Sequence, residues 1–352
     1  MDLSLLYFAN DSTGTGARYE LLTEGARFAD RNGFAAVWMP ERHFHRFGGL
    51  YPNPAVTAAA VAMATEHVAI RAGSVVAPLH DPLRIAEEWA VVDNLSGGRA
   101  GVSFASGWHP VDFGLAPDHY ADRWDRTLAV LAEVQALWRG ESVARVDGRG
   151  EPVELRVYPP PVQAELPVWL TTTGKPEVFR QAGALGAGVL THLVRQQPET
   201  LAENIAAYRA ALGPGQRGHV TLMLHTFLDH DRDRAREIVR EPMRSYLASS
   251  LNLVGRAPSA GARRDTARSL PEAKTGELLD LAFDRYFTGG GLFGDQDDAI
   301  AMVRRMAAIG VDEIACLIDF GVPAPAVLES LEVLAAVRKS VAEEAVADVR
   351  RA

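Results

Sequence analysis

Eight short apolar segments, each followed by a segment with helical periodicity, predict an α/β protein of the (β/α)8 TIM-barrel class. The length of 352 residues fits one barrel of roughly 250 residues with insertions, or two ordinary domains. A hydrophobic fraction of 47% is enough for a large buried core. The apolar segments are largely continuous, which is typical of parallel strands covered on both faces. We therefore expect a single barrel domain over residues 1–352 rather than an open doubly wound sheet.

The predicted strands follow one another along the whole chain, and helices separate them. The strands are expected at 2–9, 35–39, 68–76, 100–106, 168–173, 187–193, 220–228 and 313–319. The helices are expected at 18–31, 55–65, 83–95, 120–138, 176–184, 198–212, 297–309 and 325–345. Asn53 and Asp81 are each followed by proline, which is typical of a helix start, and the pair Gly97-Gly98 closes the third helix.

Two insertions interrupt the repeat of strand and helix. The first, at about 142–162, contains the turn sequence Asp-Gly-Arg-Gly and is expected to form a hairpin after the fourth unit. The second, at about 230–296, is a long lid-like excursion after the seventh strand, with helical stretches at 234–251 and 275–285. Between those stretches, the polar segment 256–269 is interpreted as a lid or substrate-recognition element over the barrel mouth.

Composition and charge exclude several classes of function. The net charge is −9, and the 36 Lys and Arg residues are scattered without a basic stripe, which argues against nucleic-acid binding. The single cysteine, Cys316, excludes an intramolecular disulfide and lies in an apolar run that favours a buried, unreactive thiol. The N-terminus lacks a basic n-region, and no apolar run approaches the roughly 20 residues of a membrane span. We therefore expect a cytoplasmic protein.

In a TIM barrel the residues that follow each strand surround the active-site mouth, so the strand ends supply the candidate residues. After the second strand, Glu41, Arg42, His43, His45 and Arg46 lie close together in the sequence. Such a cluster indicates a functional site, and the alternative is a solvated loop with structural ion pairs. His43 and His45 have the spacing of a metal-binding pair, but no third ligand with informative spacing follows and the arginines would repel a cation. No metal site is therefore expected.

Small residues and an aromatic residue follow the third and fourth strands. Gly73 and Ser74 lie at the end of the third strand, and Ser103, Ser106 and Trp108 lie at the end of the fourth. This combination suggests a flat ligand that approaches the backbone, with Trp108 as a wall. The alternative is that Trp108 belongs to the ordinary core.

The fifth strand ends at Thr172-Thr173-Gly174, just before Pro176 begins a helix. Hydroxyl groups, a glycine and a free helix N-terminus favour a bound phosphate. Simple capping of the helix by threonine is the alternative. The run GALGAG at 183–188 follows a helix and precedes a strand, the reverse of a dinucleotide-binding fingerprint.

The mouth residues resemble those of the bacterial luciferase-like monooxygenase family. Residues 41–44, Glu-Arg-His-Phe, are similar to the Glu-His-His-Phe segment of bacterial luciferases. The stretch 73–99 resembles the core signature of the family, and residues 106–113 resemble its Gly-Trp segment. Within the family, residues 310–321 are most similar to the subgroup found in natural-product gene clusters. In one departure, the first luciferase histidine falls at Arg42, which stays protonated and cannot act as a base.

This resemblance implies a flavin-dependent monooxygenase. Reduced FMN, supplied by a separate flavin reductase, would react with O2 to give a C4a-(hydro)peroxyflavin that oxygenates a small organic or carrier-protein-tethered substrate. The resemblance also implies a homodimer packed through helices near strands two and three, and a non-proline cis peptide near Gly73–Ser74. The expected catalytic residues are Arg42, His43 and His109. The expected cofactor-binding residues are Phe8, Gly73, Ser74, Ser103, Ser106, Trp108, Asp112, Arg123, Trp124, Thr172, Thr173 and Gly174.

Three other functions remain open at this point. A coenzyme F420-dependent hydride-transfer enzyme shares this fold and family signature, and it would not use oxygen. A non-catalytic flavin-binding relative is disfavoured by the titratable residues at 41–45, which pure binding does not require. A metal-dependent hydrolase on the same barrel is the third possibility. Hydroxylation, Baeyer–Villiger insertion and N-oxidation all stay open as the reaction type.

Overall fold

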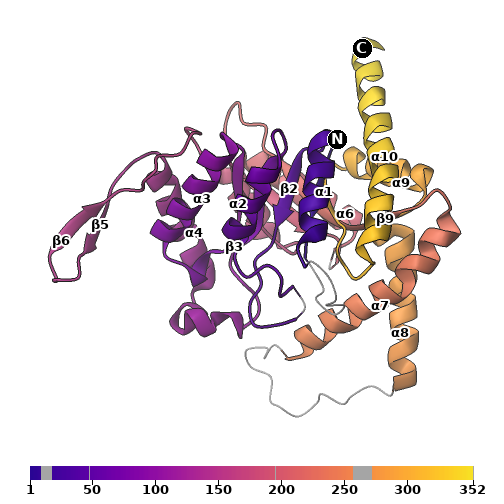
Figure 1. Cartoon of the computed structure of the whole chain (residues 1–352), viewed down its shortest axis with the longest axis horizontal. Coiled ribbons are helices and arrows are strands. Elements are labelled where there is room, and N and C mark those ends of the chain that lie inside the picture. Colours follow the sequence, from indigo (N-terminus) through magenta and orange to yellow (C-terminus); the bar gives the residue numbers. More distant parts are fainter. Residues whose placement is uncertain (9–17, 47, 195, 257–271, 352) are drawn as a thin grey trace.

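The computed structural model describes residues 1–8, 18–46, 48–194, 196–256 and 272–351, and it contains a closed parallel barrel (Figure 1). In the described residues, eight strands pair around the barrel in chain order, and the last pairs with the first. They are β1 Asp2–Leu6, β2 Ala36–Met39, β3 Ala69–Val76, β4 Ala100–Ala105, β7 Val168–Thr171, β8 Gly188–His192, β9 Val220–Leu228 and β11 Glu313–Leu317. Each coincides with a predicted strand, so the TIM-barrel prediction is confirmed.

Helices surround the barrel, and the predicted end signals form the predicted contacts. The helices of the repeat are α1 Glu20–Arg31, α2 Pro54–Ala64, α3 Pro82–Ser96, α4 Arg123–Trp138, α5 Pro176–Ala184, α6 Pro198–Ala211, α9 Gln296–Ala308 and α10 Ala324–Arg351. The Asn53 side chain accepts hydrogen bonds from two backbone amides of α2, and Asp81 accepts one from α3. Gly97 ends α3 in the left-handed conformation, with φ of 69°.

Both insertions lie where the sequence predicts them. β5 (Val143–Val146) and β6 (Pro152–Leu155) form an antiparallel hairpin that projects away from the barrel (Figure 1). The second insertion contains α7 (Arg232–Arg256) and α8 (Glu272–Arg285), followed by a short additional strand, β10 (Leu292–Gly294), which pairs with β9. β10 was not predicted, because three residues are too few to show a strand pattern. Apart from its first residue, the predicted lid segment 256–269 lies outside the described residues.

A charged cluster closes the end of the barrel at which the strands begin. Its centre is Glu313, the first residue of β11, which is fully buried. Its carboxylate contacts Ser4 Oγ at 2.5 Å, Arg71 Nη1 at 2.7 Å, and Trp38 Nε1 and His219 Nε2 at 2.9 Å. Burial would raise the pKa of Glu313, but Arg71 and then His219 lower it to about 2. The opposite end of the barrel, at the carboxyl ends of the strands, is therefore the end left for a ligand.

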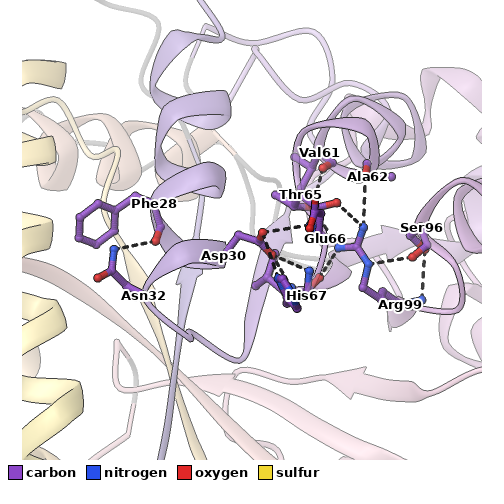
Figure 2. Close-up of polar contacts among 11 residues, drawn as sticks. Phe28, Asp30, Asn32, Val61, Ala62, Thr65, Glu66, His67, Ser96 and Arg99 are labelled. Atoms are coloured by element: carbon purple, nitrogen blue, oxygen red, sulfur yellow. Dashed lines mark hydrogen bonds and ion pairs between the residues drawn. The ribbon is translucent and has the colours of Figure 1, made fainter.

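Further polar contacts at this end join helix ends to strand starts (Figure 2). The Asp30 carboxylate of α1 accepts hydrogen bonds from the backbone amides of residues 66–68 at 2.7 to 3.0 Å. Arg99, directly before β4, donates to the carbonyl oxygens of Ala62, Thr65, Val68 and Ser96. The Leu-Ser-Gly-Gly-Arg motif at 95–99 therefore lies far from the mouth and fixes the junction of α2, α3 and β3.

The sequence predicts no membrane-spanning segment and a buried cysteine. None of the helices in the described part of the chain has the length and apolar character needed to cross a bilayer. Cys316 lies fully buried in β11, and burial raises the pKa of its thiol to about 12. The prediction of a buried thiol at this position is therefore confirmed, and a raised pKa disfavours the reactive thiolate.

Candidate active site

The polar cluster after β2 is organised by the buried carboxylate of Glu41. Nε2 of His43 and Nε2 of His80 both lie 2.7 Å from Glu41 Oε1, and the backbone amide of Val76 donates to Oε2 at 2.7 Å. Burial disfavours the charged form, but the hydrogen bonds from His43 and His80 hold the pKa of the Glu41 carboxyl below its usual range. Glu41 is therefore an anion that fixes two imidazole rings, and His43 keeps Nδ1 for other contacts.

Sequence reasoning missed His80, although the signal was present. His80 follows the end of β3 closely, after a 3-10 turn at Ala77–Leu79, so the rule for strand ends could have included it. Glu41, His43 and His80 place their ligand atoms within 4.8 Å of one another, a geometry that could hold a metal ion. We interpret the set as a hydrogen-bonded triad, because both imidazoles lie at hydrogen-bond distance from one oxygen. The absence of a metal site stays a prediction.

Arg42 and Asp112 form a buried ion pair beside this triad. Arg42 Nη1 lies 2.5 Å from Asp112 Oδ2, and the two side chains are 2% and 6% exposed. Burial lowers the pKa of Arg42 and raises that of Asp112, so their attraction does not fully offset the lost solvation. None of the described residues bonds to Nε or Nη2 of Arg42, or to Oδ1 of Asp112. Buried donors without a partner are the groups that a bound acceptor or anion would satisfy.

Trp108 and His109 complete this side of the site. Trp108 is 48% exposed, so it does not belong to the ordinary core. The guanidinium of Arg42 lies 5.0 Å from the Trp108 ring centroid, and the His109 ring lies 5.2 Å from it. His109 is buried, and burial followed by the charge of Arg42 lowers its pKa, so the ring is neutral near pH 7. The two residues therefore offer a flat apolar wall and a neutral imidazole.

A cavity of about 410 Å³ opens beside Arg42 and His43. Its lining contains two arginines, two histidines and, within the described part of the chain, no carboxylate; the lining residues are Arg42, His43, Phe44, His45, Arg46, Gly49 and Pro52. Phe44 has φ of 55°, which is rare for a residue with a side chain, and its ring is exposed. Strained backbone of this kind is common where a residue contacts a ligand. The cavity therefore suits an electron-rich or anionic ligand.

Three hydroxyl groups meet inside the barrel at the ends of β3, β4 and β7. Thr171 Oγ1 lies 2.7 Å from Ser74 Oγ and 2.6 Å from Ser103 Oγ. Thr171 was not among the predicted site residues, because the phosphate site was assigned to the neighbouring threonines at 172 and 173. The hydroxyl chain links the third and fourth strand ends to the start of the predicted phosphate site.

The family assignment follows from the sequence match. Residues 1–313 match the family model described as luciferase-like monooxygenase.

The chain belongs to the luciferase-like monooxygenase family.

The family assignment agrees with similarity to individual proteins. The chain is 24% identical over 317 residues to the oxygenase component of a flavin-dependent trigonelline monooxygenase of Acinetobacter baylyi, covering 86% of this chain and 84% of that protein. It superposes with a TM-score of 0.72 on the oxygenating constituent of 3,6-diketocamphane monooxygenase from Pseudomonas putida, solved in complex with FMN (17% identity, 95% and 96% covered). It superposes on the coenzyme F420-dependent tetrahydromethanopterin reductase of Methanopyrus kandleri with a TM-score of 0.70 and 16% identity, covering 93% of this chain and 96% of that one. At these identities, the structural similarities show the fold alone.

The luciferase-like chain lacks one expected feature at the end of β3. The prediction of a non-proline cis peptide near Gly73–Ser74 is wrong, because the peptide bonds there are trans and the cis bond of the described residues is Tyr158–Pro159. The pairing of β3 with β4 instead shifts between Ala72 and Val75, where β3 gains one residue. Such a bulge redirects the strand end without a cis bond. A Cβ at Gly73 would lie 3.2 Å from the side chain of Trp38, which favours glycine there.

The region predicted to hold the flavin phosphate has its own internal contacts. The buried Thr172 hydroxyl accepts hydrogen bonds from the backbone amides of Gly174 and Lys175 at 3.3 and 3.2 Å, while Thr173 is exposed. Gly174 has φ of 103°, a conformation that glycine adopts readily. Thr172 therefore closes the turn before α5 but does not cap the helix itself, whose N-cap residue is Lys175. Any phosphate contact would come in addition.

The remaining predicted cofactor residues make contacts of their own; of these residues, Phe8 lies near Arg42, because a Cβ at Gly48 would meet both side chains. Arg123, the first residue of α4, donates to the Tyr120 carbonyl at 2.7 Å, and its guanidinium lies 4.5 Å from that ring. Trp124 packs against the hydrophobic core. The backbone amide of Phe8 donates to Asp319 Oδ1 at 2.6 Å. Ser106 is half-buried after β4.

β9 supplies a further buried histidine that sequence reasoning did not identify. His225 is in register with Leu317 of β11, and its ring lies 4.5 Å from Tyr246 of α7 and 5.7 Å from Phe320. Burial lowers the pKa of His225 to about 3, so this imidazole is neutral. A single histidine within an apolar strand does not change the strand pattern, so it is easily overlooked. The Leu-His-Thr sequence within β9 was the signal that could have identified it.

Proposed function

We propose that this chain is a monooxygenase that uses reduced FMN and O2 on a small organic or carrier-protein-tethered substrate in secondary metabolism. The observation that carries the proposal is the buried guanidinium of Arg42, whose Nε and Nη2 lack partners in the described structure beside an open cavity. When bound, reduced flavin supplies the electrons that activate oxygen. The name of the Acinetobacter relative, an oxygenase component, supports a separate flavin reductase as the source of reduced FMN.

The residues of the site fit a reduced flavin. An isoalloxazine ring could pack on the exposed face of Trp108 and approach the backbone at Gly73. The unpartnered donors of Arg42 would hold an anionic or oxygen-rich group next to the ring. His109 would offer a neutral imidazole, and His43, fixed by Glu41, would hold a proton at the cavity. The protein's part is then to orient the ring, exclude water and stabilise negative charge.

We further propose that Thr172, Thr173, Gly174 and Arg123 bind the phosphate of the cofactor. We expect Thr173→Val to weaken the binding of reduced FMN by about 10- to 100-fold, because one hydrogen bond to a charged group is lost. Thr172→Val should weaken binding at least as much, because it also removes the cap on Gly174 and Lys175. Anaerobic titration followed by flavin fluorescence measures both affinities.

The matched control for this titration is Thr23→Val, because the Thr23 hydroxyl bonds only to carbonyls within α1 or next to it. Its affinity for reduced FMN should equal that of the wild type. Unchanged affinity in both Thr172→Val and Thr173→Val would remove the phosphate site from this strand end. Titration with coenzyme F420 tests the alternative function, a hydride-transfer enzyme, which the shared fold of the F420-dependent reductase keeps open.

We propose a homodimer packed through α2 and α3. Val56 and Met63 of α2 are 67% and 72% exposed, and Val91 and Leu95 of α3 are exposed beside them. Met63→Glu should convert a dimer to a monomer, because a buried charge would then lack a partner. Light scattering after size exclusion measures the mass. Val146→Glu, on the exposed hairpin, is the control that should remain dimeric. A monomeric wild type would contradict the proposal.

A further inference from the structure

We propose that His80 is a positioning residue of this site, which sets the orientation and the charge state of His43 through their shared partner Glu41. His80 does not itself line the cavity. A role of His80 in the reaction rests on the proposed function. The coupling between the two imidazoles does not, and it can be tested in the protein without any cofactor.

The geometry connects solvent to the cavity through one carboxylate. The Glu41 side chain is fully buried, the His80 side chain is 30% exposed, and the His43 side chain is 9% exposed. Both imidazoles contact the same oxygen, Oε1, and the backbone amide of Val76 donates to Oε2. The amide fixes the orientation of the carboxylate, so the two rings share one fixed acceptor atom. His80 faces the outside of this arrangement, and His43 lines the cavity.

Charged groups lie on both the solvent side and the cavity side of the triad. His80 lies between the 3-10 turn Ala77–Leu79 and the N-cap of α3, and Glu88 of α3 adds negative charge near it. Arg84 of α3 pairs with Glu88 at 3.0 Å. The neighbouring His119 uses Nδ1 to contact the carbonyl of Pro78. On the cavity side, the charged and titratable neighbours are the paired Arg42 and Asp112, together with His45 and Arg46 of the cavity lining.

Two imidazoles on one carboxylate compete for protons. Their Nε2 atoms lie within 4.8 Å of each other, so a proton on one ring disfavours a proton on the other. Burial lowers the pKa of His80, but the hydrogen bond and the charge of Glu41, with Glu88, raise it above its ordinary value. A proton held on His80 offsets the charge of Glu41 and opposes a second proton on the cavity-side ring, which contacts the same carboxylate oxygen.

The test is a pH titration of the histidine rings by NMR in cofactor-free protein labelled with 15N-histidine. In the wild type we expect His43 and His80 to titrate in two coupled steps. In His80→Gln, which keeps an amide donor but cannot be charged, we expect the chemical-shift midpoint of His43 to rise by about one pH unit. The pH profile of oxygen consumption with reduced FMN should move in the same direction.

The matched control is His67→Asn, which removes an exposed histidine that pairs with Asp30 at the opposite end of the barrel. It should leave the titration of His43 unchanged. Independent one-step titrations of His43 and His80 in the wild type would overturn the proposal, and this measurement needs no variant to fold. An unchanged His43 midpoint in folded His80→Gln would overturn it as well. Coupled titration without FMN binding would instead contradict the proposed function alone.

Discussion

Replacing Arg42 with methionine should lower the rate of oxygenation by about 10²- to 10³-fold, the usual effect of removing a donor aimed at developing negative charge. Arg42 is the one residue of the site that combines a fixed positive charge with two donors, Nε and Nη2, unpartnered in the described structure. Arg42→Lys should recover little of the rate, because a lysine has no planar set of donors. Oxygen uptake with reduced FMN and product yield measure the effect.

A loss of stability must be separated from this loss of rate. Arg42→Met leaves Asp112 as a buried charge without a partner, which costs about 3–5 kcal/mol in the free energy of unfolding. The double variant Arg42→Met/Asp112→Asn removes both charges and should regain most of that stability. Its rate should stay as low as that of Arg42→Met. Recovery of the wild-type rate in the double variant would show that Arg42 acts only on folding.

Glu313→Gln should destabilise the fold by about 3–5 kcal/mol, the effect of breaking a buried ion pair on one side. Glu313 bonds to Arg71, His219, Ser4 and Trp38 inside the barrel, and a neutral amide cannot compensate the largely buried guanidinium of Arg71, whose side chain is 15% exposed. Denaturant unfolding followed by circular dichroism gives the free energy of unfolding. The control is Glu87→Gln, because the Glu87–Arg84 pair is exposed and should contribute less than about 1 kcal/mol.

The same carboxylate makes stability depend on pH in a defined direction. The pKa of Glu313 falls from an ordinary value of 4.5 to about 2 in the folded state, which corresponds to about 3 kcal/mol. Because the folded pKa is lowered, this stabilisation is fully present above pH 4.5 and is lost as the pH falls towards 2. The wild type should therefore lose more stability than Glu313→Gln across this interval. Parallel acid unfolding curves for the two proteins would contradict the assignment.

The two ends of the barrel differ in how their charged and aromatic side chains are paired. The end near Glu313 is filled by ion pairs and aromatic rings, with the guanidinium of Arg71 4.9 Å from Trp38 and 4.6 Å from Trp169. The opposite end keeps the unpartnered donors of Arg42 beside a cavity, with the Trp108 indole against the same guanidinium. Buried Trp169 Nε1 and Thr221 Oγ1 near Glu313 also lack partners among the described residues, but the charges of Glu313 and Arg71 are paired there. At the mouth, donors of a charged group are left for a ligand.

The sequence by itself determined the order of the strands and helices and the positions of the insertions. Continuous apolar segments, the N-caps Asn53 and Asp81 and the glycine at 97 are local signals, and each acts within a few residues of itself. The rule for strand ends also indicated Arg42, His43, Trp108 and His109 as candidates, and the family resemblance added Asp112; these residues lie together at the mouth. Local signals were sufficient because chain order fixes which strand ends meet in a barrel.

Only the tertiary structure decided which polar atoms are paired and which are left for a ligand. His80 reaches Glu41, and Arg42 reaches Asp112, across different strand–helix units, and Glu313 meets Arg71 across the barrel interior. The bulge in β3 takes the place of the cis peptide that the family resemblance implied. Hydrophobic periodicity carries no information on such pairs, because they depend on side-chain directions after the barrel has closed.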